Sequence, residues 1–424
     1  MRAALTCCSQ TVQTFSVSAL LLRDGRVARH DATDCAPLDI LIAESGRIER
    51  VAPAIEAGPA VRVVQLEGRL VVPGLIDAHQ HLDKTRTLRT VPNPQGTLYG
   101  AIEAFGRYAA GMSAEDVAAR AERTLAACLA RGTVAIRSHA NVDPEARCRG
   151  VEALVGLRSR WRERMRLQVV AFVTAGATKA GVPAREWLEE AIALGADVVG
   201  GTPTYADEPM AFLDMLFDTA ERHGKPIDLH LDEHLDATRT QFDAVIERTR
   251  AHGMAGKVVA SHCSALSALE PREAARVIEG FAAAGIGVVT LPAANLFLQG
   301  RDAAKLPPRG LTRIAELQSA GVPVASASDN IQDPFVPSGT GDLLEIARWA
   351  LLAGHLGSND LGKAFEMISS VPARLLGFGE EYGIRVGARA DLLLTEAADP
   401  ADLVASGSLA RTVLVAGRVV AGSL

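Results

Sequence analysis

The stretch Leu70-Val71-Val72-Pro73-Gly74-Leu75-Ile76-Asp77-Ala78-His79-Gln80-His81 decides how this chain is interpreted. It is a nearly continuous apolar run, which is typical of a buried strand in a parallel sheet. Because strand side chains alternate with period two, His79 and His81 project to the same side. Two neutral imidazoles that converge at one strand end can bind a divalent cation. A His-x-His pair alone, however, does not distinguish a metal site from structural histidines.

From His79 onward, short apolar runs alternate with longer amphipathic stretches, as in repeated βα units. Helical patterns such as 114–130 and 186–194 separate the runs, and several runs follow a Gly or Pro that would end a helix. This pattern predicts an α/β fold built on a (β/α)8 barrel, although a doubly wound open sheet could use the same units. The eight predicted strands are 75–81, 134–140, 167–173, 197–202, 227–232, 258–263, 286–291 and 322–328.

The two ends of the chain follow a different pattern. Residues 16–72 contain short strand-like runs separated by turns, and the tail adds similar segments at 390–394 and 411–420. Strands at both termini need partners that cover their apolar faces, so we expect them to share one small, discontinuous β-sandwich. The predicted domains are a β-sandwich of residues 1–72 and 378–424 and a catalytic barrel of residues 73–377.

Composition narrows the classes of function. The 424 residues include 48% hydrophobic and 22% charged residues, which is ordinary globular usage. A net charge of -6 and a pI near 6.0 give no basic surface for nucleic acid. No run is long enough to span a membrane, and polar residues interrupt the signal-like start at 1–22. The six cysteines form no paired framework, so we expect reduced thiols and a cytoplasmic protein.

Residues that can bind metals or transfer protons stand at the ends of four predicted strands. They are His79 and His81, His230 and Glu233, His262, and Asp329. Barrel enzymes carry their reactive groups at the C-terminal ends of the strands. One strand-end histidine is more often structural, but four strands of one barrel that each bring such a residue to the same end indicate an active site.

With these motifs the chain resembles the amidohydrolase superfamily, and within it the cytosine deaminase-like branch. The resemblance covers nearly the whole chain and implies a hydrolase that acts on small molecules at C–N bonds other than peptide bonds, commonly as a homo-oligomer. Its motifs are Val72 to Thr85, His230-Leu231-Asp232-Glu233, Ala260-Ser261-His262, Asn295-Leu296-Phe297-Leu298-Gln299-Gly300-Arg301, Ser328-Asp329-Asn330-Ile331-Gln332-Asp333-Pro334-Phe335 and Gly387-Ala388-Arg389-Ala390-Asp391-Leu392.

The resemblance implies a mononuclear metal site that leaves one position open for water. Its ligands would be His79, His81, His230 and Asp329, and the ion would be Zn(II) or Fe(II). Binuclear relatives carry a bridging lysine at the end of strand four, whereas this chain has Gly200-Gly201-Thr202 there. Lys84 follows the first strand instead, and we favour a solvated or salt-bridged Lys84 over one that contacts substrate.

The same resemblance assigns the catalytic roles. Glu233 would protonate a ring nitrogen and then the leaving amine, and Asp329 would accept a proton from the metal-activated water. His262 would hydrogen-bond the attacking oxygen. The alternative for Glu233 is a solvated loop carboxylate. His139, at the end of the second strand, is either a support for the metal ligands or a wall of the pocket.

Three positions depart from the cytosine deaminase pattern and are the candidate substrate contacts. Thr174 stands where those enzymes carry a glutamine that binds the amide edge of the pyrimidine, and a hydroxyl cannot make that paired contact. Asn330 replaces a carboxylate of the strand-eight motif, and Phe335 stands where a tryptophan is expected. These differences argue against cytosine itself, and the His-Leu-Asp-Lys segment at 81–84 is closer to relatives that act on s-triazines and other N-heterocycles.

From the resemblance we predict a metal-dependent hydrolytic deaminase that releases ammonia from a cyclic amidine or amino-N-heterocycle. Pyrimidine-, pterin-, triazine- and creatinine-like rings all qualify. One alternative is an amidohydrolase that cleaves an N-alkylamino or amide C–N bond and releases an amine. Another is a non-catalytic binding or scaffold protein on the same fold, although the complete set of site residues counts against it.

Overall fold

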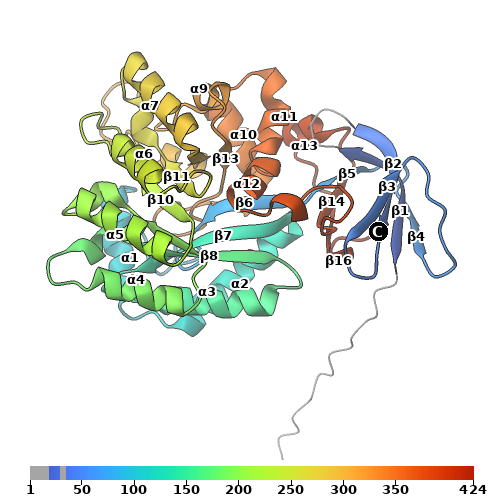
Figure 1. Cartoon of the computed structure of the whole chain (residues 1–424), viewed down its shortest axis with the longest axis horizontal. Helices are drawn as coiled ribbons and strands as arrows, with labels where there is room; N and C mark the ends of the chain where they lie inside the picture. Colours follow the sequence, from blue (N-terminus) through green and yellow to red (C-terminus); the bar gives the residue numbers. More distant parts are fainter. Residues whose placement is uncertain (1–18, 29–34) are drawn as a thin grey trace, which may run out of the picture.

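The structure is a computed structural model that describes residues 19–28 and 35–424. Figure 1 shows a barrel surrounded by helices and, beside it, a β-sheet that contains strands from both ends of the chain. Most of the signal-like segment, together with Cys7 and Cys8, lies outside the described residues. Among the residues that are described, no helix is both long and apolar enough to cross a membrane.

The barrel is a sheet of eight parallel strands, numbered in sequence order from β6 to β13 in the described part of the chain. The Asp329 N–H donates to the His79 carbonyl at 2.9 Å, and the His81 N–H donates to the Asp329 carbonyl at 3.2 Å, which joins the two ends of the sheet. The predicted (β/α)8 barrel is confirmed, and the open-sheet alternative is wrong. The strands are β6 (Leu75–Gln80), β7 (Thr133–Val142), β8 (Arg166–Val173), β9 (Val198–Gly201), β10 (Ile227–Leu231), β11 (Val258–His262), β12 (Gly287–Thr290) and β13 (Val324–Ser326).

Each barrel strand overlaps one of the predicted apolar runs, and the bounds differ by a few residues. The apolar runs are continuous because both faces of the sheet are covered; all ten residues of β7, for example, are buried. The least regular strand is β13, which has three residues where the sequence predicts seven. The predicted residues that follow it, Ala327 and Ser328, lead into the loop that carries Asp329.

Helices cover the outer face of the barrel. The predicted helix 114–130 is α2 (Ala114–Ala130), and it begins where the Ser113 side chain accepts the Asp116 N–H. The predicted helix 186–194 is α4 (Ala184–Ala193). The other helices are α1 (Leu98–Ala109), α3 (Arg149–Trp161), α5 (Pro209–Arg222), α6 (Phe242–Ala251), α7 (Pro271–Ala284), α8 (Pro292–Leu298), α9 (Ile314–Ser319), α10 (Leu343–Ala353), α11 (Leu361–Glu366), α12 (Ser370–Leu375) and α13 (Pro400–Ser406).

The second sheet joins the two ends of the chain through β5 and β14, which pair antiparallel with Leu392 opposite Pro73. One edge of β1 pairs with β2. On its other edge, the first half of β1 pairs with β4 and the second half pairs with β5. The strands are β1 (Leu20–Ala28), β2 (Cys35–Ile42), β3 (Ile48–Ala52), β4 (Arg62–Gln65), β5 (Leu70–Pro73), β14 (Leu392–Thr395), β15 (Arg411–Val415) and β16 (Arg418–Ala421).

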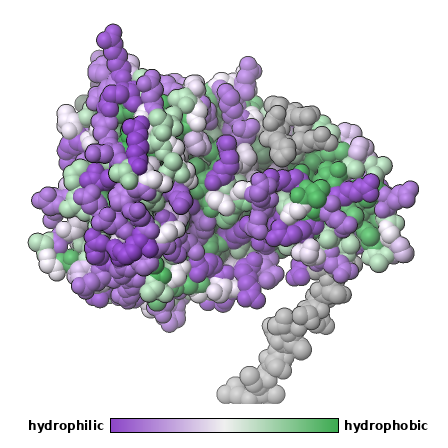
Figure 2. All heavy atoms as spheres, in the orientation of Figure 1, coloured by the Kyte–Doolittle hydropathy of each residue, from purple (hydrophilic) through white to green (hydrophobic). Residues whose placement is uncertain are grey.

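This end sheet encloses an apolar core of its own, which includes Leu22, Ile40 and Leu392. In Figure 2 hydrophobic atoms gather over the end sheet, whereas the helical side of this face is mostly hydrophilic. The prediction that both chain ends build one β unit is confirmed. The domain limits of 1–72 with 378–424, and of 73–377, stay a prediction.

Candidate metal centre and active site

Four predicted site residues meet at the C-terminal end of the barrel. His79 lies on β6, His230 on β10 and His262 at the end of β11, while Asp329 follows β13. Each contributes one donor atom to a group whose members all lie within 4.8 Å of one another. All four side chains are buried. Residues up to 250 positions apart in the chain therefore form one compact cluster of nitrogen and carboxylate donors.

Local backbone geometry turns two of these side chains toward the barrel axis. His262 has φ 66° and Asp329 has φ 58°, in the left-handed region that residues with a Cβ rarely adopt. Residues in such conformations cluster at functional sites, where the surrounding structure holds them in place. For Asp329, the two backbone hydrogen bonds to β6 that close the barrel supply this hold. Barrel closure and placement of the carboxylate therefore have the same cause.

The donor atoms of this cluster fit a metal ion. Among the described residues, the buried atoms His79 Nε2, His262 Nε2 and Asp329 Oδ1 have no hydrogen-bond partner, and His79 Nε2 lies 3.6 Å from Asp329 Oδ1. Buried polar atoms without partners are costly, and native structures keep few of them. A cation at the centre of the group would satisfy His79 Nε2 and Asp329 Oδ1 together.

Hydrogen bonds behind His79 leave its Nε2 available as a ligand. Its Nδ1 lies 2.9 Å from Ser261 Oγ, and that hydroxyl donates to Asp228 Oδ1 at 3.1 Å. Because the hydroxyl proton is directed at the carboxylate, the Ser261 oxygen accepts the Nδ1 proton of His79. The lone pair of Nε2 then faces the cluster, which is the usual arrangement around a metal-bound histidine.

The histidines of the cluster are neutral. Burial, reinforced by the neighbouring imidazoles, lowers the pKa of His79 and His230 well below the usual value. Burial and the nearby Lys84 ammonium do the same for the pKa of His81. Neutral imidazoles are the form that binds metal ions, so no proton has to be removed before a cation can enter.

His81 lies at the edge of the four-donor group. Its Nε2 is 3.0 Å from His230 Nε2 and 3.3 Å from Asp329 Oδ1, while its Nδ1 contacts Lys84 Nζ at 2.9 Å. Lys84 is 3% exposed, pairs with Asp83 at 3.3 Å and donates to Asn141 Oδ1 at 2.7 Å. The predicted salt bridge of Lys84 is confirmed, and the solvated alternative is wrong.

A second group of donors, formed by His79, His139 and Asp228, lies deeper in the barrel. Its carboxylate already has a cationic partner, because Arg137 Nη1 donates to Asp228 Oδ2 at 2.8 Å. Burial alone would raise the pKa of Asp228, but His139 and Arg137 outweigh it and lower that pKa. The His139 ring stacks on His79 at 3.9 Å between centroids, so these contacts support the first group from behind.

Glu233 stands beside the cluster as a buried acid. Its Oε1 lies 3.5 Å from His262 Nδ1, and only 8% of the residue is exposed. Burial and the negative charge of Asp329 raise the pKa of Glu233 well above its usual value. Burial therefore favours the protonated form of the carboxyl group. The alternative of a solvated loop carboxylate is wrong, because the side chain is buried.

The backbone of Glu233 is held by two side chains that the sequence did not single out as contacts. Tyr205 Oη donates to the Glu233 carbonyl at 2.9 Å, and Gln299 Nε2 donates to the same oxygen at 3.1 Å. Tyr205 belongs to a short 3-10 helix, η2 (Pro203–Tyr205), that follows β9. Gln299 lies in the Asn295–Arg301 motif, so the sequence indicated that this segment belongs to the site. No local pattern shows which residue Gln299 contacts.

The three candidate substrate contacts lie on two sides of the barrel mouth. Thr174 is half-buried at the end of β8, and its Oγ1 is 3.4 Å from Asp143 Oδ2. Asn330 Nδ2 donates to Asp333 Oδ2 at 2.7 Å, and the Phe335 N–H donates to Asp333 Oδ1 at 2.8 Å. The loop after β13 therefore holds Asn330 and Phe335 through one buried carboxylate.

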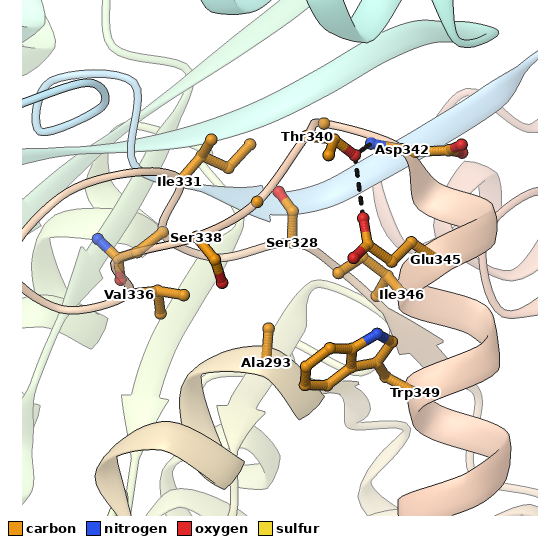
Figure 3. Close-up of a pocket in the computed structure, with 13 residues that line it drawn as sticks. Ala293, Ser328, Ile331, Val336, Ser338, Thr340, Asp342, Glu345, Ile346 and Trp349 are labelled. Carbon is orange, nitrogen blue, oxygen red and sulfur yellow. Dashed lines mark hydrogen bonds between the residues drawn. The ribbon is translucent and has the colours of Figure 1, made fainter.

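A small cavity lies behind this loop, and it is not the substrate site. Its volume is about 20 Å³, and Ser328, Asn330, Ala293 and Trp349 are among its walls. Figure 3 shows the Trp349 ring facing Ala293 on one side of the cavity. On another side, Thr340 Oγ1 donates a hydrogen bond to Glu345 Oε2 at 2.9 Å. Such a space holds about one water molecule and is far too small for a heterocycle.

Comparisons with known proteins agree with this geometry. The profile of the amidohydrolase family matches residues 62–174 and 94–421. A pterin deaminase of Rhizobium rhizogenes is 34% identical, over 91% of this chain and 88% of the relative. The crystal structure of 5-methylcytosine deaminase from Klebsiella pneumoniae with 5-fluorocytosine superimposes with a TM-score of 0.88 at 30% identity, over 95% of this chain and 98% of the other. N-isopropylammelide isopropylaminohydrolase from Burkholderia multivorans gives a TM-score of 0.81 at 32% identity, over 96% and 99%.

Proposed function

Because this chain belongs to the amidohydrolase family, we propose that it is a metal-dependent hydrolase that releases ammonia from an amino-substituted N-heterocycle. The observation that carries this function is a buried carboxyl, Glu233, next to a buried group of metal-binding donors at the C-terminal end of a (β/α)8 barrel. The relatives at 30% identity or more act on pterin, 5-methylcytosine and N-isopropylammelide, which are all N-heterocycles.

We propose that the metal site holds one divalent ion, Zn(II) or Fe(II), through His79, His81, His230 and Asp329. When bound, such an ion supplies a Lewis acid that activates water at neutral pH. The strand that carries a bridging lysine in binuclear relatives is β9. Here it ends at Gly201 and is followed by Thr202, which favours one ion. The neutral state of the histidines and the unpartnered atoms of the cluster support this ligand set.

Proton transfer is assigned to the side chains around this site. Glu233 in its protonated form donates to a ring nitrogen, which makes the adjacent carbon more electrophilic. The resulting carboxylate takes up the hydroxyl proton of the tetrahedral adduct and passes it to the amine as the C–N bond breaks and the C=O bond forms. The proton that Asp329 took from water then restores the Glu233 acid. Asp329 accepts a proton from the attacking water. His262, which lies between Glu233 and Asp329, hydrogen-bonds the oxygen that gains negative charge.

Substrate selection is assigned to Thr174, Asn330 and Phe335. A threonine hydroxyl at 174 offers a single donor and acceptor, so it cannot bind an amide edge as a carboxamide does. The Asn330 amide is already bound to Asp333, and Phe335 adds an apolar ring 5.9 Å from Lys84 Nζ. These three residues favour an N-heterocycle other than cytosine.

A second candidate function is release of an alkylamine from an N-alkylamino heterocycle. The observation that favours it is the 32% identity to N-isopropylammelide isopropylaminohydrolase over almost the whole chain. Both functions use the same metal site and the same proton donor. They differ in the leaving group, so product analysis separates them.

The test is an assay of ammonia release from purified protein loaded separately with Zn(II) and Fe(II). The panel contains aminopyrimidines, pterins, aminotriazines and creatinine-like rings, with Glu233→Gln as the matched inactive control. We expect ammonia from at least one ring class with the wild-type protein and none with the variant. Amine release without ammonia would favour the second candidate, and purified protein without stoichiometric metal would contradict both.

A further inference from the structure

Helix α8 (Pro292–Leu298) and the residue that follows it contact both proposed proton-transfer residues. Asn295 is completely buried, and its Nδ2 lies 3.1 Å from His262 Nδ1. Gln299, four positions later, donates from Nε2 to the Glu233 carbonyl at 3.1 Å. Residues four apart on a helix share a face, so one face of this short element meets His262 and Glu233 together.

The contact of Asn295 decides which nitrogen of His262 carries the proton. The His262 ring is buried, and burial disfavours a charged imidazole. A neutral imidazole has one N–H and one lone pair. If the Asn295 amide nitrogen donates to Nδ1, the His262 proton sits on Nε2. That atom is buried, has no hydrogen-bond partner among the described residues and lies 4.0 Å from Asp329 Oδ2.

The opposite orientation of the Asn295 amide is less favourable. With the nitrogen toward His262, the atom left without a partner is the carbonyl oxygen Oδ1. With the amide rotated, a buried NH₂ group with two donors would be left instead. Unpartnered buried N–H groups are rarer in proteins than under-used carbonyl oxygens. The network around the amide therefore selects the orientation in which Asn295 donates.

We propose that α8 positions the proton-transfer residues, with Asn295 holding His262 in the Nε2–H tautomer and Gln299 anchoring the backbone of Glu233. This inference rests on the proposed function. It makes His262 a hydrogen-bond donor aimed at the reacting centre and removes it from the possible metal ligands. The four-donor group then contributes His79, His230 and Asp329 to the ion, and His81 supplies the remaining ligand.

Gln299 shares its task with Tyr205, since both donate to the Glu233 carbonyl. Loss of one donor leaves the other in place, so we expect a small effect from Gln299→Met or Tyr205→Phe alone. The double variant should lose more activity than the two single losses multiplied. Asn295 has no such substitute among the described residues, where the other polar contact of His262 Nδ1 is the Glu233 carboxyl at 3.5 Å.

The tautomer is measured by NMR on the full chain labelled with 15N-histidine and loaded with Zn(II). The His262 signals are identified by their absence in His262→Gln. We expect Nε2 to carry the proton in the wild-type protein and Nδ1 to carry it in Asn295→Asp, because a carboxylate can only accept. A wild-type spectrum with the proton on Nδ1, or with Nε2 bound to zinc, would overturn the proposal.

Kinetics provide the second measurement. Removal of one donor to a developing oxyanion typically costs 10²–10³-fold in kcat, so we expect a loss of about 10²-fold in Asn295→Asp and Asn295→Leu, with KM and zinc content unchanged. The matched control is Leu298→Ala, which removes a buried side chain of the same helix that faces the apolar core. This control should lose thermal stability but keep kcat. Equal kcat losses in Leu298→Ala and Asn295→Leu would overturn the positioning role.

The two proposals fail in different ways. If zinc-loaded wild-type protein turns over no compound of the panel, the proposed function has failed, and the NMR measurement still decides the tautomer. If the wild-type protein is active and the Asn295 variants keep its kcat, the function stands and the role of α8 is wrong.

Discussion

Two layers of buried polar side chains lie one above the other in the barrel. The site layer consists of His79, His139, His230, His262 and Asp329. The support layer consists of Asp77, Arg137 and Asp228, which precede His79, His139 and His230 by two positions and so lie on the same face of each strand. Both layers are almost completely buried.

The two layers differ in where their hydrogen bonds go. In the support layer, Asp228 accepts from Arg137 and Ser261, and Asp77 accepts from Ser328 and Gln80. In the site layer, by contrast, His79 Nε2 and Asp329 Oδ1 have no hydrogen-bond partner among the described residues. A buried polar network that satisfies itself belongs to the fold, whereas one that leaves donors converging on a point is built to bind something.

The largest effect is expected from a substitution that disrupts the site layer alone. In His230→Ala the remaining ligands should hold the metal far more weakly, so metal content and turnover should both fall to background. Atomic emission and the ammonia assay measure the two quantities. The matched control is His234→Ala, four residues along the chain and outside the donor group, which should keep its metal. Full metal occupancy in His230→Ala would show that the assigned site is wrong.

The next effect separates chemistry from metal binding within the site layer. Glu233→Gln keeps the shape of the side chain but has no carboxyl proton to donate. We expect turnover to fall by about 10²–10⁴-fold, with metal content unchanged. Steady-state kinetics and metal analysis on the same preparation test this. A parallel loss of metal would instead make Glu233 part of the metal site.

Breaking the support layer should cost stability. Arg137→Met leaves Asp228 buried without its cation, so we expect the free energy of unfolding to fall by about 3–5 kcal/mol. Urea unfolding of the metal-free protein measures the change. The control is Arg158→Met, which breaks a half-exposed ion pair with Asp197 and should cost no more than about 1 kcal/mol. Similar losses in the two variants would remove the distinction between the layers.

Unfolding measured over a range of pH tests the site layer further, because burial disfavours the protonated form of His262. Burial lowers the pKa of His262 from 6.5 to about 4 in the folded protein. Between these two values the unfolded chain binds a proton that the folded protein does not bind. The contribution of His262 to the free energy of unfolding is therefore full above pH 6.5 and is lost as the pH falls toward 4. Relative to His262→Gln, the metal-free wild-type protein should lose about 3 kcal/mol of unfolding free energy between pH 7 and pH 4. Unfolding curves at both pH values measure this. A pH-independent difference would mean that His262 titrates normally.

The smallest effect concerns specificity rather than either layer. If Thr174 excludes the cytosine amide edge, Thr174→Gln should raise turnover of cytosine-like substrates several-fold, because a carboxamide can make the paired contact. The ratio of kcat/KM values for cytosine and for the best ring of the panel is the measurement. An unchanged ratio would leave Thr174 without a role in selection.

Much of the fold was predictable because its signals are local. Apolar runs bounded by Gly and Pro located all eight barrel strands, and the capped amphipathic pattern gave helix 114–130 its correct bounds. The shortness of β13 was not predictable. The residues that follow it, Ala327 and Ser328, lead to Asp329, whose backbone bonds to β6, and that bond joins residues some 250 positions apart.

In the candidate site the residue types were readable, but their contacts were not. Strand-end positions and the family resemblance selected His79, His230, His262 and Asp329, and the structure brings them together. The burial of Lys84 escaped prediction, because its position just after a strand end is equally compatible with solvent. The hydrogen bonds of Asn295 to His262 and of Gln299 to Glu233 cross between separate βα units, and no local spacing encodes them.

The sequence by itself determined the parallel strands, the end of the barrel at which reactive groups gather and the chemical types of those groups. These properties follow from hydrophobic periodicity and from the direction of each strand, which neighbouring residues set. Only the tertiary structure decided which donors face one another, which acid is buried beside them and which nitrogen of His262 is held by Asn295. Those outcomes depend on distances, angles and burial between strands that are remote in the chain, because these quantities set the strength of hydrogen bonds and electrostatic interactions.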